Sequence, residues 1–173
     1  KCTAVAPSDA GAELWREFVD RFTCNDTELA AYLQQVAGLA AVGRVCPEAL
    51  RIADGAGGNG KSTFFNTLSR VLGDYAGALS ADVLTSSANK NAGPELAELR
   101  GRRLVIAAEL EEGRRLDTSI LKRISSTDPI TANPKYRDPF QFVPSHTPVL
   151  YTNFLPRVGS SDAGTWSRLV VIP

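Results

Sequence analysis

The residues with the clearest chemistry lie in one glycine-rich segment, GAGGNGKST. Its spacing, G-x-x-x-x-G-K-S, is that of a phosphate-binding P-loop. Glycines let the backbone curl so that successive N–H groups point at phosphate oxygens, and a following helix N-terminus adds positive potential. Lys61 can reach the β- and γ-phosphates, and the Ser62 hydroxyl can bind Mg²⁺. The segment predicts a site for ATP and Mg²⁺, formed by Gly55, Gly57, Gly58, Asn59, Gly60, Lys61, Ser62 and Thr63.

Hydrolysis of a bound nucleotide also needs an acid. Glu109 directly follows the apolar run LVIAA, where a carboxylate can hold Mg²⁺ through water or polarise the attacking water. Glu111 and Glu112 are near enough to share this task, although a strand-to-helix turn commonly carries such solvated charges. We therefore assign the acid to Glu109, as a catalytic residue beside Lys61 and as a second Mg²⁺ ligand beside Ser62.

Two polar residues near the C-terminus complete the candidate set. Asn153 ends the apolar run TPVLYT and can hold the attacking water or contact the γ-phosphate; alternatively, it caps the turn that follows. Arg168 precedes the last apolar run. It can neutralise charge on a neighbouring subunit's nucleotide, or it is a surface arginine.

The hydrophobic pattern places these residues at the ends of strands. An apolar run, the glycine-rich turn and a helical pattern follow one another at residues 49–72, which is the context that a P-loop requires. Strands alternating with helices predict an α/β fold with a mainly parallel sheet. The other expected elements are helices at 12–22, 94–100 and 118–124, and a helix that starts at Glu28 and ends near Gly38 or Gly43. Strands are expected at 102–109, 147–153 and 168–173, a strand or helix at 78–84, and a hairpin at 130–143 with its tip near 134–138.

Composition narrows the remaining possibilities. The chain has 173 residues, 43% of them hydrophobic, and equal numbers of acidic and basic residues, which argues against a protein coated in positive charge. Three scattered cysteines and one histidine make a zinc site or a disulfide framework an unlikely reading and favour a reducing cytosol. No apolar run is long enough to span a membrane, and no signal peptide is visible. The chain has no Met, so we expect it to be part of a longer polypeptide.

Taken together, the motifs resemble superfamily 3 helicases, and in particular the primase-helicases of phages, satellite phages and plasmids, which are related to the poxvirus type. The likeness covers most of the chain. GAGGNGKSTFFNTLSRVLGDYA is similar to the Walker A segment of that family, and LRGRRLVIAAELEEGRRLDTSILKRISSTDPITANPKYRDPFQF to its Walker B and B′ region. TPVLYTNFLPRV resembles motif C, with Asn153 as the polar sensor, and TWSRLVVIP resembles the arginine-finger segment, with Arg168 as the finger.

The resemblance implies an AAA+-like P-loop ATPase at residues 49–173, preceded by a helical segment at residues 1–48. It implies a homo-oligomeric ring, expected to be a hexamer, with ATP between subunits and no membrane partner. It also implies movement along single-stranded DNA through the hairpin residues Lys135, Tyr136 and Arg137, with Lys122 as a further basic contact. A phage or plasmid protein of this type works in the cytoplasm of a bacterial host.

The chain departs from the family pattern at three places. Ser126-Thr127-Asp128 stands where the family usually has Gly-Gly-Asp before the hairpin, and Ala108 stands where many P-loop ATPases have Asp. The sequence stops at Pro173, so a downstream winged-helix region and an upstream primase domain are not seen.

Two other functions fit parts of the sequence. A small-molecule P-loop kinase opens with the same loop, but it needs an arginine-rich lid that Arg102-Arg103 and Arg114-Arg115 do not resemble. A nucleotide-gated DNA-binding assembly module would switch state without turnover, which the candidate acid, sensor and finger argue against.

Overall fold

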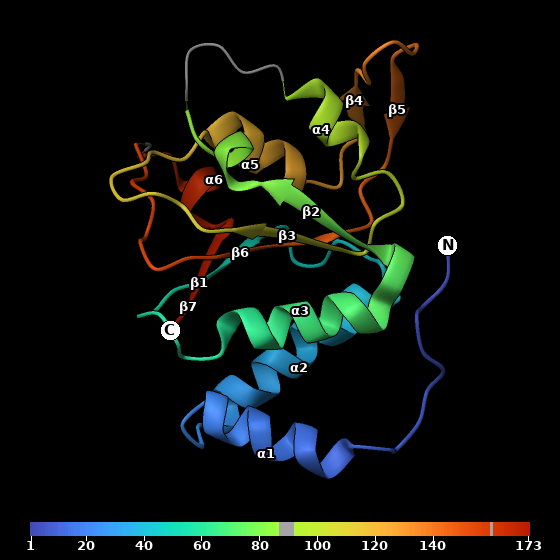
Figure 1. The fold of residues 1–173 in the computed structure, drawn as a ribbon. Helices are drawn as coiled ribbons and strands as arrows, with labels where there is room; N and C mark the ends of the chain where they lie inside the picture. The colour runs from blue at the N-terminus through green and yellow to red at the C-terminus, as the bar shows by residue number, and fades with distance from the viewer. Residues whose placement is uncertain (87–91, 160) are drawn as a thin grey trace.

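A five-stranded parallel sheet forms the centre of the molecule. The computed structural model describes residues 1–86, 92–159 and 161–173. The strand order is β2-β3-β6-β1-β7, and every neighbouring pair is parallel. Figure 1 shows the sheet between two layers of helices, as the sequence pattern predicted. The strands are β1 (Leu50–Ala53), β2 (Ala76–Ser80), β3 (Leu104–Ala108), β6 (Thr147–Tyr151) and β7 (Leu169–Ile172).

Three helices cover one face of this sheet: α1 (Ala12–Phe22), α2 (Thr27–Val42) and α3 (Lys61–Leu72). The carboxylate of Asp26 accepts hydrogen bonds from the first free amides of α2, and Gly43 ends that helix in a left-handed conformation. Side chains from α2, α3 and the sheet share one buried apolar cluster, which joins the N-terminal helices to the sheet. The expected bounds of α1 are confirmed, and α2 ends at Gly43 rather than at Gly38, the other end that the sequence allowed.

The buried face of α1 differs from the expected one. The helical spacing indicated Leu14, Phe18 and Phe22 as its apolar stripe. In the structure Leu14 is 72% exposed, and Trp15 packs against the cluster instead, stacked on Phe64 with ring centroids 5.4 Å apart. Phe18, Val19 and Phe22 pack against the cluster as expected, so only the first position of the stripe moves, from Leu14 to Trp15, whose ring contacts α3.

The other face carries shorter elements. They are α4 (Gly93–Ala97), α5 (Thr118–Ser125), α6 (Ala163–Trp166), and the antiparallel hairpin of β4 (Ile130–Ala132) and β5 (Phe140–Phe142). The Asp117 carboxylate caps α5 by accepting the Ser119 and Ile120 amides. Burial tends to raise the pKa of Asp117, but these hydrogen bonds and the Ser119 hydroxyl outweigh it and lower that pKa.

Most expected elements are found, and two details are resolved. The ambiguous run at 78–84 is both a strand and a helix, because β2 ends at Ser80 and a 3₁₀ turn occupies Ala81–Leu84. The four-residue α6 had no sequence signal. Among the described residues, no helix has the length and apolar character needed to cross a membrane.

Candidate active site

The P-loop connects the carboxyl end of β1 to the start of α3, as the sequence predicted. Gly55, Gly58 and Gly60 all have positive φ, of 147°, 82° and 95°. A β-carbon at Gly55 would lie 2.5 Å from the Asn59 side-chain nitrogen and 3.4 Å from the Lys61 Nζ, so any larger residue would fill the centre of the loop. The loop is therefore a cradle that only glycine leaves open, which suits a phosphate.

Lys61 occupies the centre of that cradle. Its side chain is 6% exposed, and its ammonium donates to the Gly55 carbonyl at 2.5 Å, the Ala56 carbonyl at 3.3 Å and the Asn59 Oδ1 at 3.0 Å. Ser62 and Thr63 are exposed in the first turn of α3, where the helix dipole is positive. The ammonium, a hydroxyl at the helix start and free amides are the groups that hold a nucleotide's phosphates and its Mg²⁺.

The N-terminal helical segment supports the loop directly. Gly60 precedes α3 in a left-handed conformation, and a β-carbon there would lie 3.2 Å from Phe22 and 3.6 Å from Phe18. Phe22 also stacks on Phe64 of α3, with centroids 5.3 Å apart. The aromatic face of α1 thus fixes the end of the P-loop, a contact that the sequence pattern did not indicate.

The ends of three neighbouring strands bring the acid and the sensor to the loop. Tyr151 of β6 lies level with Ala53 of β1 and Ala108 of β3. Glu109 and Asn153 follow directly, so they share the P-loop edge of the sheet. The Asn153 side-chain nitrogen lies 3.9 Å from where a β-carbon of Gly57 would be. The register therefore places both residues at the carboxyl edge of the sheet, and Asn153 close to Gly57 of the loop.

Glu109 has a backbone conformation that a non-glycine residue rarely adopts. Its φ is 57°, and its amide donates to the Tyr151 carbonyl at 3.0 Å. Such left-handed residues cost about 1–2 kcal/mol and cluster at functional sites. The exposed Glu109 side chain lines a groove of 660 Å³ between α3, β2 and the loop after β3, which also includes Glu111 and Arg114. The left-handed backbone thus occurs at the residue that directly follows β3, and the Glu109 carboxylate lies in the wall of this groove.

Thr152 is a supporting residue that the sequence did not reveal. It is 1% exposed, and its hydroxyl accepts the Leu110 amide at 3.3 Å and the Phe154 amide at 3.1 Å. Its own amide donates to the Ala53 carbonyl at 3.0 Å. Thr152 therefore ties together the segments that carry Glu109 and Asn153, and its position beside Asn153 is the only clue in the sequence.

No cluster of three or more His, Cys, Asp or Glu side chains suited to a metal occurs in the described part of the chain.

Arg168 lies away from these residues. It immediately precedes β7, whose first residue, Leu169, is level with Leu50 at the start of β1, so Arg168 stands at the edge opposite the P-loop. Its guanidinium contacts the Glu48 carboxylate at 2.6 Å and the Gly164 carbonyl at 2.9 Å. The structure therefore brings together Lys61, Glu109 and Asn153, but not Arg168.

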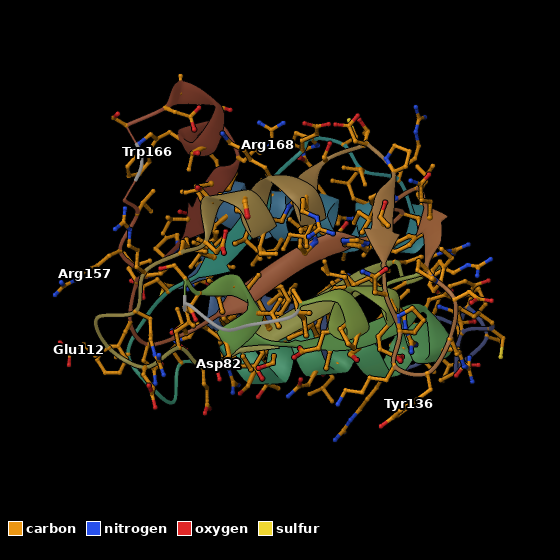
Figure 2. The ribbon with its side chains drawn as sticks, turned by 90° about the horizontal axis from the view of Figure 1, so that it is seen from above. Asp82, Glu112, Tyr136, Arg157, Trp166 and Arg168 are labelled. Carbon is orange, nitrogen blue, oxygen red and sulfur yellow. The ribbon has the colours of Figure 1, made fainter. Side chains whose placement is uncertain are left out.

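The hairpin tip also lies at that opposite edge. Figure 2 shows Tyr136 at the other end of the molecule from Glu112, which follows β3. Tyr136 is fully exposed with a φ of 59°, and Lys135 and Arg137 beside it are exposed as well. Lys122 differs from them, because its ammonium is paired with the Asp162 carboxylate at 2.7 Å.

The arginines that a kinase lid would need hold the fold's own loops. Arg102 donates to the Asp74 and Ala76 carbonyls, and Arg103 donates to the Ala41 carbonyl and lies over the Tyr75 ring. Arg114 pairs with Glu111, and Arg115 donates to the Gly159 carbonyl. None of these contacts points an arginine at the P-loop.

Comparison with known proteins extends these observations. Residues 53–168 match a family of unknown function, DUF5906. A putative helicase of Acanthamoeba polyphaga mimivirus is 33% identical over 150 residues, covering 86% of this chain and 16% of that protein. A putative primase of African swine fever virus is 32% identical over 118 residues, covering 66% of this chain and 12% of that protein. The chain therefore spans less than a fifth of either viral protein.

Solved structures give the same fold. The apo C-terminal region of NrS-1 superposes with a TM-score of 0.65 at 16% identity, covering 99% of this chain and 39% of that one. JCV helicase superposes with a TM-score of 0.50 at 14% identity, covering 92% of this chain and 50% of that one. At these identities the likeness concerns the fold alone.

Proposed function

Because the chain belongs to the DUF5906 family and has the fold of a superfamily 3 helicase ATPase domain, we propose that it hydrolyses Mg-ATP and couples hydrolysis to movement on single-stranded DNA. The names of its viral relatives, helicase and primase, support a role in DNA replication. Those relatives belong to large DNA viruses, whereas an origin in a phage or plasmid and work in a bacterial cytoplasm rest on the sequence resemblance alone.

One observation carries the proposal: Glu109 and Asn153 share the P-loop edge with Lys61, although the three are far apart in the sequence. In this arrangement Lys61 and the loop amides hold the phosphates, and Ser62 binds the metal at the helix start. Glu109 takes up a proton from water or orients that water, and the Asn153 amide fixes its position. Bound Mg-ATP supplies the phosphoanhydride bond and the counter-charge that this chemistry uses.

The position of Arg168 supports an assembly in which each subunit completes its neighbour's site. Arg168 cannot reach the P-loop of its own chain, because the two stand at opposite edges of the sheet. Near it, Trp166 is 53% exposed and Val171, on the edge strand β7, is 52% exposed. Exposed apolar groups around a charged residue suit a subunit interface. We infer a homo-oligomeric ring, of six subunits by resemblance, with Arg168 as a finger acting in trans.

The hairpin supplies a surface for DNA. Tyr136 is fully exposed, and the exposed Lys135 and Arg137 flank it. An exposed aromatic ring can stack on a base, while lysine and arginine contact phosphates. Lys122 is committed to Asp162 within the subunit, so it is a weaker DNA contact than the three hairpin residues.

The proposal is tested by the steady-state ATPase rate of the purified full chain, with and without single-stranded DNA, at several protein concentrations. We expect the rate per subunit to rise with protein concentration, because sites form between subunits, and to rise again with DNA. A rate independent of both would overturn the helicase assignment.

Two variants test the site itself. Lys61→Ala should abolish tight ATP binding because it removes the charge that faces the phosphates, whereas Arg70→Ala, an exposed change on the same helix, should not. Arg168→Ala should retain binding and lose turnover. Mixing Lys61→Ala with Arg168→Ala subunits should restore part of the activity, and mixed assemblies that stay inactive would refute action in trans.

A further inference from the structure

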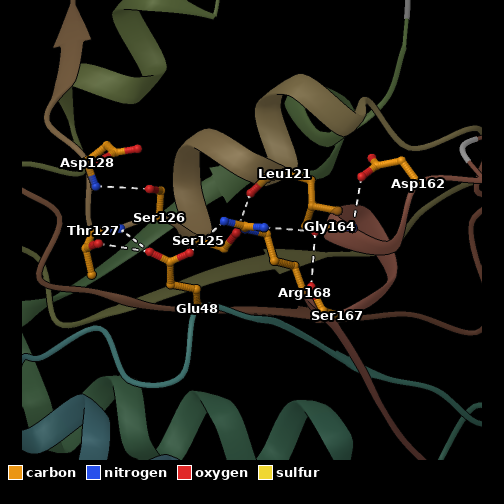
Figure 3. A network of polar contacts seen from close by, with 10 residues as sticks. All are labelled: Glu48, Leu121, Ser125, Ser126, Thr127, Asp128, Asp162, Gly164, Ser167 and Arg168. Carbon is orange, nitrogen blue, oxygen red and sulfur yellow. Dashed lines mark hydrogen bonds and ion pairs between the residues drawn. The ribbon is translucent and has the colours of Figure 1, made fainter.

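Glu48 joins three segments that are far apart in the sequence. It lies just before β1, at the edge of the sheet opposite the P-loop. One carboxylate oxygen accepts the amide and the hydroxyl of Thr127, both at 2.9 Å, and the other contacts the Arg168 Nη2 at 2.6 Å. Figure 3 shows the carboxylate between these two partners. Thr127 lies in the bend between α5 and the hairpin, and Arg168 immediately precedes β7.

We propose that Glu48 is a positioning residue, which orients the Arg168 guanidinium and links it to the base of the DNA hairpin. This inference rests on the proposed function, in which Arg168 contacts the nucleotide phosphate of a neighbouring subunit.

The contacts of Arg168 explain how its orientation is set. Nη2 donates to Glu48 and Nη1 to the Gly164 carbonyl at 2.9 Å, which fixes the guanidinium plane at two points. The side chain is 24% exposed, and its Nε is buried without a partner among the described residues. A guanidinium has five N–H donors, so two bonds leave others available for a phosphate. Glu48 therefore fixes the orientation of the guanidinium and leaves N–H donors available for a phosphate. This lowers the entropy that is lost when the phosphate binds.

The same carboxylate transmits movement from the hairpin. The amide and hydroxyl of Thr127, and then Arg168, lower the pKa of Glu48, so the carboxylate stays ionised at neutral pH. A pocket of 280 Å³ beside Arg168 is lined by the basic residues Lys122, Arg123 and Arg168 and by the acidic residue Asp128. Any displacement of Thr127 when DNA pulls the hairpin acts on a charged group that also holds Arg168. Three hydrogen bonds to one carboxylate thus couple the position of the finger to that of the hairpin.

The test compares kcat, KM for ATP and the ratio of DNA-stimulated to basal rate in the full chain. Glu48→Gln keeps the size of the side chain and an acceptor for Thr127, but removes the charge that pairs with Arg168. We expect kcat to fall about tenfold or more, because a misplaced catalytic group costs up to about a hundredfold, with little change in KM. Thr127→Val removes the hydroxyl bond, and it should reduce the stimulation ratio. Glu13→Gln, the same change at an exposed position on α1, is the control and should leave all three quantities unchanged.

A purely structural role gives a different pattern. If Glu48 acts through Arg168, Glu48→Gln should have no additional effect on kcat once Arg168 is replaced by Ala. The thermal unfolding midpoint of Glu48→Gln should stay close to that of the wild type, because both charged groups are partly exposed. A variant that unfolds early and loses basal and stimulated rates in equal proportion would refute positioning, as would an increase in kcat.

The outcome also separates this inference from the proposed function. If the wild-type chain shows no ATPase stimulated by single-stranded DNA, the proposed function fails. If it does, and Glu48→Gln keeps the wild-type kcat and stimulation ratio, the assignment of Glu48 fails alone.

Discussion

His146, the single histidine of the chain, should make folding stability depend on pH between about 6.5 and 4. The ring is fully buried just before β6. Its Nε2 lies 3.0 Å from the Ile124 carbonyl, to which it donates, and its Nδ1 is buried with no partner in the described part of the chain. Protonation would place an N–H and a charge where no acceptor exists. Burial therefore lowers the pKa of His146 from 6.5 to about 4.

The magnitude follows from the difference between the folded and unfolded pKa. Because folding lowers this pKa, the stabilising contribution is complete above 6.5 and is lost as pH falls toward 4. One pKa unit corresponds to about 1.4 kcal/mol, so the whole effect is about 3 kcal/mol. Between pH 7.5 and pH 5 the free energy of unfolding should fall by about 2 kcal/mol, because the unfolded histidine is then mostly protonated and the folded one is not.

Urea unfolding followed by tryptophan fluorescence at pH 7.5, 6.5, 5.5 and 5.0 measures this change. His146→Gln keeps a side-chain N–H for the Ile124 carbonyl but does not titrate, so its unfolding free energy should change far less over the same range. Glu48, Asp117 and Asp162 have lowered pKa values, and their contributions are lost only at pH values below this window. Equal pH dependence in the wild type and in His146→Gln would refute the reasoning.

Three other substitutions have distinct expected outcomes. Glu109→Gly should raise the free energy of unfolding by up to about 1 kcal/mol, because glycine adopts the left-handed backbone without strain. The same variant should have no ATP turnover. A thermal midpoint lower than that of Glu109→Ala would contradict the predicted gain in stability. Asp117→Ala should lower the free energy of unfolding by about 1 kcal/mol in urea titrations, since it removes the N-cap of α5. Asp117→Asn should retain most of the stabilisation that the cap provides. Tyr136→Ala should leave the thermal midpoint unchanged and weaken single-stranded DNA binding by about 1–3 kcal/mol, measured by fluorescence anisotropy; unaltered affinity would exclude stacking on this ring.

The fold was largely predictable because its signals are local. The bounds of α1 and the start of α2 follow from helical spacing and from Asp26, and the buried strand β3 from one continuous apolar run. The P-loop edge was predictable as well. In a parallel sheet the carboxyl ends of neighbouring strands meet at one edge, so Glu109 and Asn153 were placed beside the loop from their positions alone.

The features that could not be predicted depend on contacts between residues far apart in the sequence, which leave no local pattern. Glu48 and Arg168 are 120 positions apart, and nothing near either residue indicates that one carboxylate binds both Arg168 and Thr127. The shift of the α1 stripe from Leu14 to Trp15 depends on the rings that α3 presents. Both features are fixed by packing between elements, for which spacing within one element gives no signal.

The contacts of Lys61 also determine what a nucleotide must do on arrival. The ammonium lies in the middle of the loop, with the Gly55 and Ala56 carbonyls and the Asn59 Oδ1 as partners. A triphosphate that binds the same cation must compete with these three oxygens. A single lysine attracts any small anion, so discrimination in favour of ATP falls to the backbone amides that only a longer polyphosphate can reach together.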